Sequence, residues 1–506
     1  MHTAPSPQPL SRKRERGFIA LLLILLFGTL YRALALQWSD LNLYVDEAQY
    51  WVWAQALDWG YYSKPPVIAA LIAATTSLFG DSELAIKSGA LIVYPLSTLL
   101  LYALARQLFN AHIAFWTALS FFTLPGVAFS SLIISTDVPL FLCWTGALYA
   151  LHRAVADEGW HWWLLLGVAC GLGLLTKYTM GIFALSTALW FGLTPSLRRQ
   201  FLQPGPYLAA AVAALLFAPN LWWNHSHGWP TFQHTADISN LEAGPGLHWD
   251  ELWEFLSGQA AILGPVLFVA LLVRLAGVRQ WWRDDTSRLL ACFTLPFLLL
   301  ISAQALLGRA NANWAAMTYA AGTLWVVSWL LQTQRRGVVI AALAVNLTAM
   351  VVAYHYHAIV RAAGIELTRK TDHYKRVQGW DALGAQVAAL LRQNPGTRLL
   401  SHERDTISEL SYYARPESAG AVWWNPEGRI DSHYALATTL HGEGGHDFLF
   451  VSRDAVLPVG MADSFLAAER LPDLHVAVVP GWSLDYRVWR LRGFIGYAPG
   501  SRNAAP

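Results

Sequence analysis

The sequence predicts an α-helical protein that crosses a membrane many times and ends in a small α/β domain. Three observations predict this fold class. First, 55% of the 506 residues are hydrophobic and only 13% are charged, whereas an ordinary soluble domain carries about 25% charged residues. Second, the mean hydropathy of +0.35 reflects long apolar runs that recur along most of the chain. Third, these runs stop near His357, after which the composition is that of a water-soluble domain.

The first apolar run, residues 17–36, follows a basic tail and is expected to form the first transmembrane helix. The basic residues of this tail place residues 1–16 in the cytoplasm, because positive charges concentrate on that side of a membrane. The basic start and an Ala-Leu-Ala ending imitate a secretory signal. Arg32 within that ending, and the polytopic chain behind it, favour an uncleaved helix.

The next apolar run, Val67–Phe79, lies in the first outer loop, residues 37–88, and is too short for a span. Counting it as a crossing would invert every later connection and move the arginines of the cytoplasmic loops outside. We therefore expect a re-entrant or interfacial helix on the outer face of the membrane.

Ten further runs are each able to span about 30 Å of hydrocarbon once flanking residues and tilt are included. They lie near residues 89–105, 112–133, 138–151, 162–176, 180–194, 206–223, 256–276, 288–307, 314–331 and 338–354. With the first run they predict eleven crossings within a transmembrane domain of residues 17–356. The cytoplasmic connections then hold ten arginines, and the outer connections hold only Lys64, Lys87, Lys177 and Arg309.

Residues 357–506 are expected to form an α/β domain on the outer side, because an odd number of crossings leaves the chain there. Short apolar segments predict strands at 398–401, 448–452 and 476–479. Helical periodicity predicts helices at 380–392, 406–413 and 461–470.

The first outer loop carries the strongest chemical signal, in the stretch YVDEAQYWVWAQALDWGYYSKPP from Tyr44 to Pro66. Asp46 and Glu47 form an acidic pair, and Lys64 precedes two prolines. Charges this close to hydrocarbon are costly and usually functional. The many tyrosines and tryptophans around them are typical of a segment in the headgroup layer.

Three more charged residues are expected at the same face of the membrane. Asp137 lies in STDVP, Lys177 lies in LTKYT, and Arg309 precedes ANANW. A carboxylate that takes a proton from a hydroxyl, and a cation that stabilises a departing phosphate, are the minimum set for glycosyl transfer from a lipid phosphate. The outer face of this protein provides both.

The stretch DEAQYWVWAQALDWGYYSKPP, followed by STDVP, resembles the first outer loop and a later outer connection of the protein mannosyltransferase and aminoarabinose transferase superfamily. The resemblance covers roughly residues 15–330. It implies a C-type glycosyltransferase fold, a polyprenyl-phosphate sugar as donor, and an active site that faces the periplasm from the bacterial inner membrane.

The resemblance also implies roles for single residues. Asp46 would be the catalytic base, Asp137 a second carboxylate of the catalytic site, and Glu47 a neighbour that tunes Asp46 or holds the loop. Lys64 would contact the donor phosphate. The sequence adds Lys177 and Arg309 as further phosphate contacts and Tyr61 and Tyr62 as substrate contacts.

Simpler interpretations of these residues stay open. Asp137 also fits a helix cap, since Thr136 precedes it and Pro139 suits a first turn. A lone cation at the end of a span, such as Lys177 or Arg309, often reaches only to the lipid headgroups.

Metal ligands are not evident in the sequence. The aminoarabinose transferases carry an acidic residue immediately before their lysine. This chain has Ser63 there and so lacks the carboxylate on which a metal or amino-sugar contact would depend. The histidines of the outer loops match no zinc-ligand spacing. The sequence therefore assigns no metal ligand, and a divalent ion stays a possible cofactor.

The expected activity is a single inverting displacement that moves a pentosyl or hexosyl group from a polyprenyl phosphate to a periplasmic acceptor. Lipid A, lipopolysaccharide or another glycolipid is the expected acceptor, and a protein hydroxyl is the alternative. A lipid flippase or transporter would carry ionisable groups near mid-span and broken helices, and a non-catalytic envelope assembly protein is a third class. The net charge of +2, spread over short loops, predicts no nucleic-acid partner.

Overall fold

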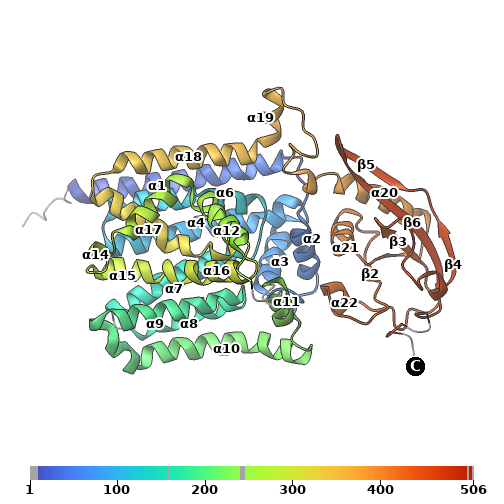
Figure 1. The fold of residues 1–506 in the computed structure, drawn as a ribbon, viewed down its shortest axis with the longest axis horizontal. Helices are drawn as coiled ribbons and strands as arrows, with labels where there is room; N and C mark the ends of the chain where they lie inside the picture. The colour runs from blue at the N-terminus through green and yellow to red at the C-terminus, as the bar shows by residue number, and fades with distance from the viewer. Residues whose placement is uncertain (1–8, 158, 240–245, 499–500, 504–506) are drawn as a thin grey trace, which may run out of the picture.

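The computed structural model describes residues 9–157, 159–239, 246–498 and 501–503 of the chain. A body of helices, most of them running along the long axis of the molecule, is joined at one end to a domain that contains the β-sheet (Figure 1). The predicted fold class, a helical membrane protein with a small C-terminal α/β domain, is confirmed.

The predicted apolar runs form the helices of the body. Their bounds are α1 (Pro9–Gln37), α4 (Glu83–Leu108), α5 (Ala111–Phe122), α6 (Pro125–Leu132), α7 (Asp137–Asp157), α8 (Trp160–Leu174), α9 (Ile182–Leu193), α10 (Pro204–Ser226), α12 (Trp249–Leu263), α13 (Pro265–Ala276), α15 (Asp285–Cys292), α16 (Leu295–Leu307), α17 (Thr318–Gln332) and α18 (Arg336–Tyr354). Within the described ranges, six helices are long and apolar enough to cross a membrane, or up to eight if each of two bent pairs is one span. The number of eleven crossings therefore stays a prediction.

One expected crossing is sharply bent. The run at 256–276 is divided between α12 and α13, which are bent by 112° relative to each other. Gly264 joins them with a φ of 86°, a backbone conformation that L side chains rarely adopt. Pro265 then begins α13, since proline is tolerated in the first turn of a helix. Hydropathy alone does not reveal such a bend, because both helices are apolar.

Three short helices form a layer between the helical body and the sheet domain (Figure 1). They are α2 (Val45–Ala54), α3 (Val67–Phe79) and α11 (Pro230–Ser239). Helix α3 has the bounds of the short apolar run of the first outer loop. Its 13 residues span about 20 Å at 1.5 Å per residue, which is shorter than the hydrocarbon layer.

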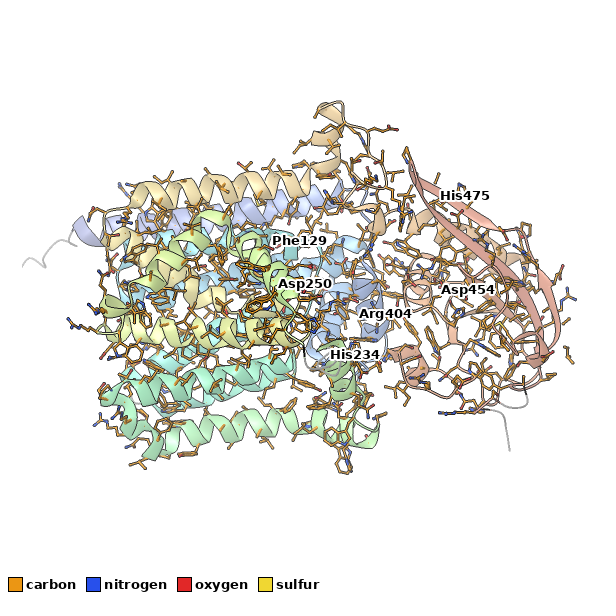
Figure 2. The ribbon with its side chains drawn as sticks, in the orientation of Figure 1. Phe129, His234, Asp250, Arg404, Asp454 and His475 are labelled. Carbon is orange, nitrogen blue, oxygen red and sulfur yellow. The ribbon has the colours of Figure 1, made fainter. Side chains whose placement is uncertain are left out.

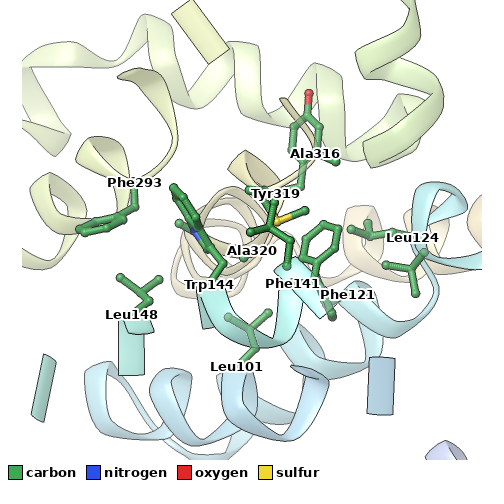
Figure 3. Packing of buried hydrophobic residues seen from close by; sticks show 14 of the residues in the cluster. Leu101, Phe121, Leu124, Phe141, Trp144, Leu148, Phe293, Ala316, Tyr319 and Ala320 are labelled. Carbon is green, nitrogen blue, oxygen red and sulfur yellow. The ribbon is translucent and has the colours of Figure 1, made fainter. Parts of the chain in front are cut away.

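The core of the body is built from large aromatic side chains packed between helices (Figure 3). Trp144 of α7 is fully buried, with its ring 5.1 Å from the ring of Phe183 on α9 and 5.5 Å from that of Phe297 on α16. Phe141, one turn earlier, packs on Phe121 of α5. This packing fixes the start of α7, where Asp137 lies.

The C-terminal domain is a mixed sheet with helices on the side that faces the body. Strands β1 (Arg398–Ser401), β2 (Val422–Trp423) and β3 (Phe448–Ser452) are parallel to one another, and β4 (Phe465–Arg470), β5 (Leu474–Val479) and β6 (Trp482–Phe494) pair in antiparallel fashion around β6. Helices α20 (Trp380–Gln393) and α21 (Arg404–Tyr413) lie between this sheet and the body (Figure 1). The predicted strands and two of the three predicted helices are confirmed.

The predicted helix at 461–470 is wrong. A single 3-10 turn, Ala462–Ser464, leads directly into β4, which pairs with β6. The segment Phe465–Arg470 has helix-favouring alanines and a glutamate, but pairing along the 13-residue β6 overrides this local preference.

Candidate active site

The acidic pair lies in the first turn of α2, where the positive end of the helix dipole favours carboxylates. Glu47 is fully buried. Its carboxylate accepts hydrogen bonds from the backbone N–H groups of Tyr44 (2.8 Å) and Ile134 (2.7 Å) and lies 3.5 Å from the ammonium of Lys87. Burial raises the pKa of Glu47, against the effect of Lys87 and of the two N–H donors. Glu47 therefore anchors α2 to the segment before α7, in keeping with the expectation that it holds the loop, and its place in the catalytic group stays a prediction.

Lys64 is held by a tight turn at the other end of the loop. The N–H of Tyr61 donates to the carbonyl of Lys64 at 3.1 Å, and Pro65 and Pro66 lead into α3. The hydroxyl of Thr231 on α11 donates to the carbonyl of Tyr61 at 2.8 Å, which fixes this turn from outside. Lys64 is half-buried, and burial together with the nearby Lys177 lowers the pKa of its ammonium to about 8, against Asp46 and Asp137.

Asp137 and Lys177 form an ion pair with a distance of 2.8 Å between Oδ1 and Nζ. The second carboxylate oxygen of Asp137 accepts a hydrogen bond from Asn313 at 2.6 Å. Both side chains of the ion pair are largely buried. The structure thus brings together Asp137, Lys177 and Asn313, which lie in three separate outer connections of the sequence.

A polar cavity of about 520 Å³ opens at this point, between the first outer loop, α11 and the segment before α17. Its charged lining residues are Asp46, Lys64, Lys177, Asp237 and Arg309. Four of these were predicted site residues. Asp237 on α11 was not singled out, because the sequence offers no motif around it.

A second, largely apolar cavity of about 520 Å³ adjoins the polar one. Side chains of α4, α6, α7, α12 and α17 line it, among them Phe129, which is labelled in Figure 2. The two cavities share Asp46, Ser135 and Asn313. Asp46 therefore lies at the junction between a cavity suited to polar groups and a cavity suited to a hydrocarbon chain.

Arg404 is a further site residue that the sequence did not indicate. It begins α21 of the C-terminal domain and lies between that domain and the helical body (Figure 2). Its guanidinium donates to Asp46 Oδ1 at 2.8 Å and to Gln49 Oε1 at 2.9 Å. More than 350 residues separate Arg404 from Asp46 in the chain, so only the tertiary structure reveals this contact.

Tyr61 and Tyr62, the predicted substrate contacts, line neither cavity. Tyr61 is buried and stacks on Trp53 with a centroid distance of 4.6 Å. Its hydroxyl donates to the carbonyl of Trp53 at 3.2 Å. Tyr62 packs against the ring of His234, 5.0 Å away. Both rings help to fold the loop that carries Lys64, and their assignment as substrate contacts stays a prediction.

Two carboxylates of the site already have polar partners. Both oxygens of Asp137 are engaged by Lys177 and Asn313, and Asp46 is paired with Arg404. At the position before Lys64, Ser63 provides no carboxylate. In the described part of the chain, a group with metal-ligand spacing is found at His402, Glu403 and Asp454. There the carboxylate of Glu403 is already occupied by Thr406, Ser452 and Arg453.

Known proteins show similarity to the chain in sequence and in fold. Residues 63–223 match the family described as dolichyl-phosphate-mannose-protein mannosyltransferase. The lipid A galacturonosyltransferase RgtD of Rhizobium johnstonii is 33% identical over 447 residues, which cover 86% of this chain and 91% of that protein. An undecaprenyl phosphate-alpha-4-amino-4-deoxy-L-arabinose arabinosyl transferase of Proteus mirabilis is 26% identical over 268 residues, which cover 49% of this chain and 46% of that protein.

The fold is that of a solved transferase structure. The crystal structure of ArnT from Cupriavidus metallidurans in the apo state superposes with a TM-score of 0.63 at 15% identity, covering 93% of this chain and 98% of that one. Fold and relatives together define an integral-membrane glycosyltransferase of the C-type fold. The chain belongs to the ArnT-like superfamily of glycosyltransferases, which includes RgtD. The superfamily resemblance seen in the sequence is thereby confirmed.

Proposed function

We propose that this enzyme transfers a sugar from a polyprenyl-phosphate donor to a lipid A-type glycolipid on the periplasmic face of the bacterial inner membrane. The proposal takes residues 17–356 as the transmembrane domain and residues 357–506 as the periplasmic domain. One observation carries it: Asp46 and Lys64, from opposite ends of one loop, line a single polar cavity that adjoins an apolar one. The names of RgtD and of the aminoarabinose transferases support the donor and the acceptor.

The charges of the polar cavity favour an anionic donor. Asp137 compensates Lys177, and Asp46 compensates Arg404. The ammonium of Lys64 and the guanidinium of Arg309 have no hydrogen-bond partner or ion pair among the described residues. A compact ammonium and a planar guanidinium are both suited to phosphate oxygens. Lys64 and Arg309 are therefore the cations available to a lipid phosphate.

The donor sugar of this proposal is a uronic acid. A uronosyl polyprenyl phosphate has two anionic groups, the phosphodiester and the sugar carboxylate. The cavity offers two cations without an ion-pair partner among the described residues, Lys64 and Arg309, beside the carboxylate of Asp237. The aminoarabinose transferases have a carboxylate immediately before their lysine, whereas this chain has Ser63. The cavity therefore lacks that partner for an amino sugar. The galacturonosyl transfer named for RgtD supports the same sugar class.

In the proposed displacement, an acceptor hydroxyl attacks the anomeric carbon of the donor and its proton passes to Asp46. The bond between that carbon and the phosphate oxygen breaks, and the polyprenyl phosphate leaves with its new negative charge stabilised by Lys64. One displacement inverts the anomeric configuration. Asp137 supports the site through Lys177, since neither of its oxygens is free to accept the proton.

A lipid acceptor is favoured over a protein hydroxyl by the apolar cavity, which suits a hydrocarbon chain of a lipid substrate. The flippase alternative is disfavoured because the charged residues of the site lie at one end of the helical body. They come from the loop between α1 and α4, the start of α7, the end of α8 and the segment between α16 and α17.

The test is transfer by the purified protein in lipid nanodiscs. Labelled uronosyl polyprenyl phosphate is supplied with lipid A or with a protein acceptor, and both the released polyprenyl phosphate and the mass of the acceptor are measured. We expect release that depends on lipid A and a uronosyl mass increase on lipid A. Translocation of the donor without release, or labelling of the protein acceptor alone, would refute the proposal.

A further inference from the structure

The C-terminal domain contributes one side chain to the active site, the guanidinium of Arg404. Asp46 and Gln49 lie one helical turn apart on α2, and the guanidinium spans that turn by donating 2.8 Å and 2.9 Å hydrogen bonds to their oxygens. A planar guanidinium with donors in a fixed fork restricts the orientation of the groups that it binds. Arg404 thus restricts the side-chain conformation of the proposed base.

Helix α21, which carries Arg404, is fixed to the first outer loop at its other end. The hydroxyl of Tyr413 accepts a hydrogen bond from the N–H of Leu43 at 2.6 Å and donates one to the carboxylate of Glu83. The hydroxyl of Tyr412 and the guanidinium of Arg415 both donate to the carbonyl of Asp81, at 3.2 Å and 2.6 Å. Because these contacts hold α21 against the start of α4, the position of Arg404 relative to α2 is determined by the fold.

The contact with Arg404 uses only one oxygen of Asp46. Oδ1 accepts from Arg404, whereas Oδ2 has no hydrogen-bond partner among the residues that the structure describes. The side chain of Asp46 is 40% exposed and lines both cavities. A base held by one oxygen, with the other free in the cavity, is arranged to receive a proton from a bound hydroxyl.

We propose that Arg404 is a positioning residue of the transfer reaction, which holds the Asp46 carboxylate so that its second oxygen meets the acceptor hydroxyl. This inference rests on the proposed function, in which Asp46 is the base. It makes the C-terminal domain a part of the catalytic machinery, although the reacting groups all belong to the membrane domain. Arg404 acts through Asp46 and touches no reacting atom.

Replacement of Arg404 is expected to lower kcat and to leave the free energy of folding nearly unchanged. Both partners of the ion pair are about 40% exposed, and exposed ion pairs contribute little to the free energy of folding. In contrast, a small misplacement of a reacting group lowers the rate by up to about 100-fold. The two effects can be separated by measuring kcat, KM and thermal unfolding on the same variants.

The experiment compares Arg404→Ala with Arg415→Ala in the full-length enzyme. Arg415 crosses the same interface, but its partners there are the carbonyl of Asp81 and the ring of Trp51, and not Asp46. We expect Arg404→Ala to lower kcat by about 10- to 100-fold with an unchanged donor KM, and Arg415→Ala to keep the wild-type kcat. Arg404→Lys should restore part of the lost kcat. Millimolar guanidinium ion should also raise the kcat of Arg404→Ala, because the vacated site is open to solvent.

Three results would overturn the assignment. A wild-type kcat in Arg404→Ala would show that Asp46 needs no such support. A raised KM with an unchanged kcat would make Arg404 a substrate contact. An equal loss in both variants, without rescue by guanidinium, would make it a purely structural residue. Failure of the proposed function is distinct from all three, because the wild-type enzyme would then release no polyprenyl phosphate.

Discussion

At the scale of single residues, Lys64 shows how burial prepares a cation for an anionic substrate. Its ammonium is half-buried in a cavity without a direct carboxylate partner in the described part of the chain, so its charge is poorly solvated until a phosphate arrives. The lowering of its pKa to about 8 expresses this cost of burial, to which Lys177 adds. An anion bound next to Lys64 would stabilise the charged form.

Donor binding should therefore depend on pH around the pKa of Lys64. Below about pH 8 the ammonium is charged, and above it the charge and its attraction for phosphate are lost. We expect the donor KM of the wild-type enzyme to rise as pH increases through 8, and the donor KM of Lys64→Arg to stay level, because arginine stays charged. At pH 7, Lys64→Ala should weaken donor binding by about 1.5–3 kcal/mol, the usual value of a charged hydrogen bond. A rise of KM with pH that persists in Lys64→Arg would assign the titration to another group.

The sequence predicted the local part of the site and missed the distant part. Asp46, Lys64 and Asp137 lie in short motifs beside apolar runs, and the structure places them in or beside one cavity, as it does Lys177 and Arg309. Glu47, Tyr61 and Tyr62 lie in the same motif, but their side chains turn to backbone groups and neighbouring rings, which residue type alone does not reveal. Arg404 could not be predicted, because nothing in the sequence links it to a loop at the other end of the chain.

At the scale of elements, the site depends on how α2 is joined to the helical body. The buried carboxylate of Glu47 binds the N–H of Ile134, just before α7, and pairs with Lys87 of α4. One side chain thereby links three elements, and two of them, α2 and α7, begin at the site with Asp46 and Asp137. Hydropathy located α4 and α7 from sequence, whereas no helix was predicted at the position of α2. The bend at Gly264 and the strand at 465–470 depend on tertiary contacts and were not found.

Removal of Glu47 should destabilise this junction. Glu47→Ala leaves Lys87 buried without its carboxylate, and breaking a buried pair in this way costs about 3–5 kcal/mol. We expect a clear fall of the melting temperature in detergent, measured by loss of the monodisperse peak after heating, together with loss of activity. Asp46→Asn is the matched control, since Asp46 is half-exposed and its neutral isostere should melt like the wild type. A wild-type melting temperature in Glu47→Ala would contradict the anchoring role.

At the scale of the whole molecule, the sheet domain and the helical body meet through α2 and α21, and this interface holds buried acidic residues. Glu409 of α21 is fully buried, and burial raises the pKa of its carboxyl far above the usual range. Glu47, Asp405 and Glu83 raise it further, and Lys87 opposes them. Burial at the docked interface therefore favours the neutral form of Glu409.

The free energy of unfolding should depend on pH because the buried Glu409 carboxyl holds its proton in the folded state. The unfolded chain loses the Glu409 proton near pH 4.5, whereas the folded protein keeps it to a much higher pH. In that window the folded state binds more protons than the unfolded state, so the free energy of unfolding falls as pH rises. Glu409→Gln removes this slope, and we expect it to be more stable than the wild type by about 1 kcal/mol or more at pH 7.5. The two proteins should converge near pH 4.5.

Thermal unfolding followed from pH 4.5 to pH 8 in the two proteins checks this expectation. Glu469→Gln, on the exposed edge strand β4, is the control for loss of a glutamate outside the interface. Melting curves of wild type and Glu409→Gln that differ by the same amount at every pH would show that Glu409 is not held neutral by domain docking.

Polyprenyl phosphate release by the purified Asp46→Asn and Lys64→Ala variants tests most directly whether Asp46 and Lys64 act as base and phosphate contact in one cavity. With saturating lipid A, we expect Asp46→Asn to bind the donor like the wild type but to release polyprenyl phosphate at least about 100-fold more slowly. We expect Lys64→Ala to lose donor affinity while it still folds. Release at the wild-type rate by Asp46→Asn, or wild-type donor affinity in Lys64→Ala, would refute these roles.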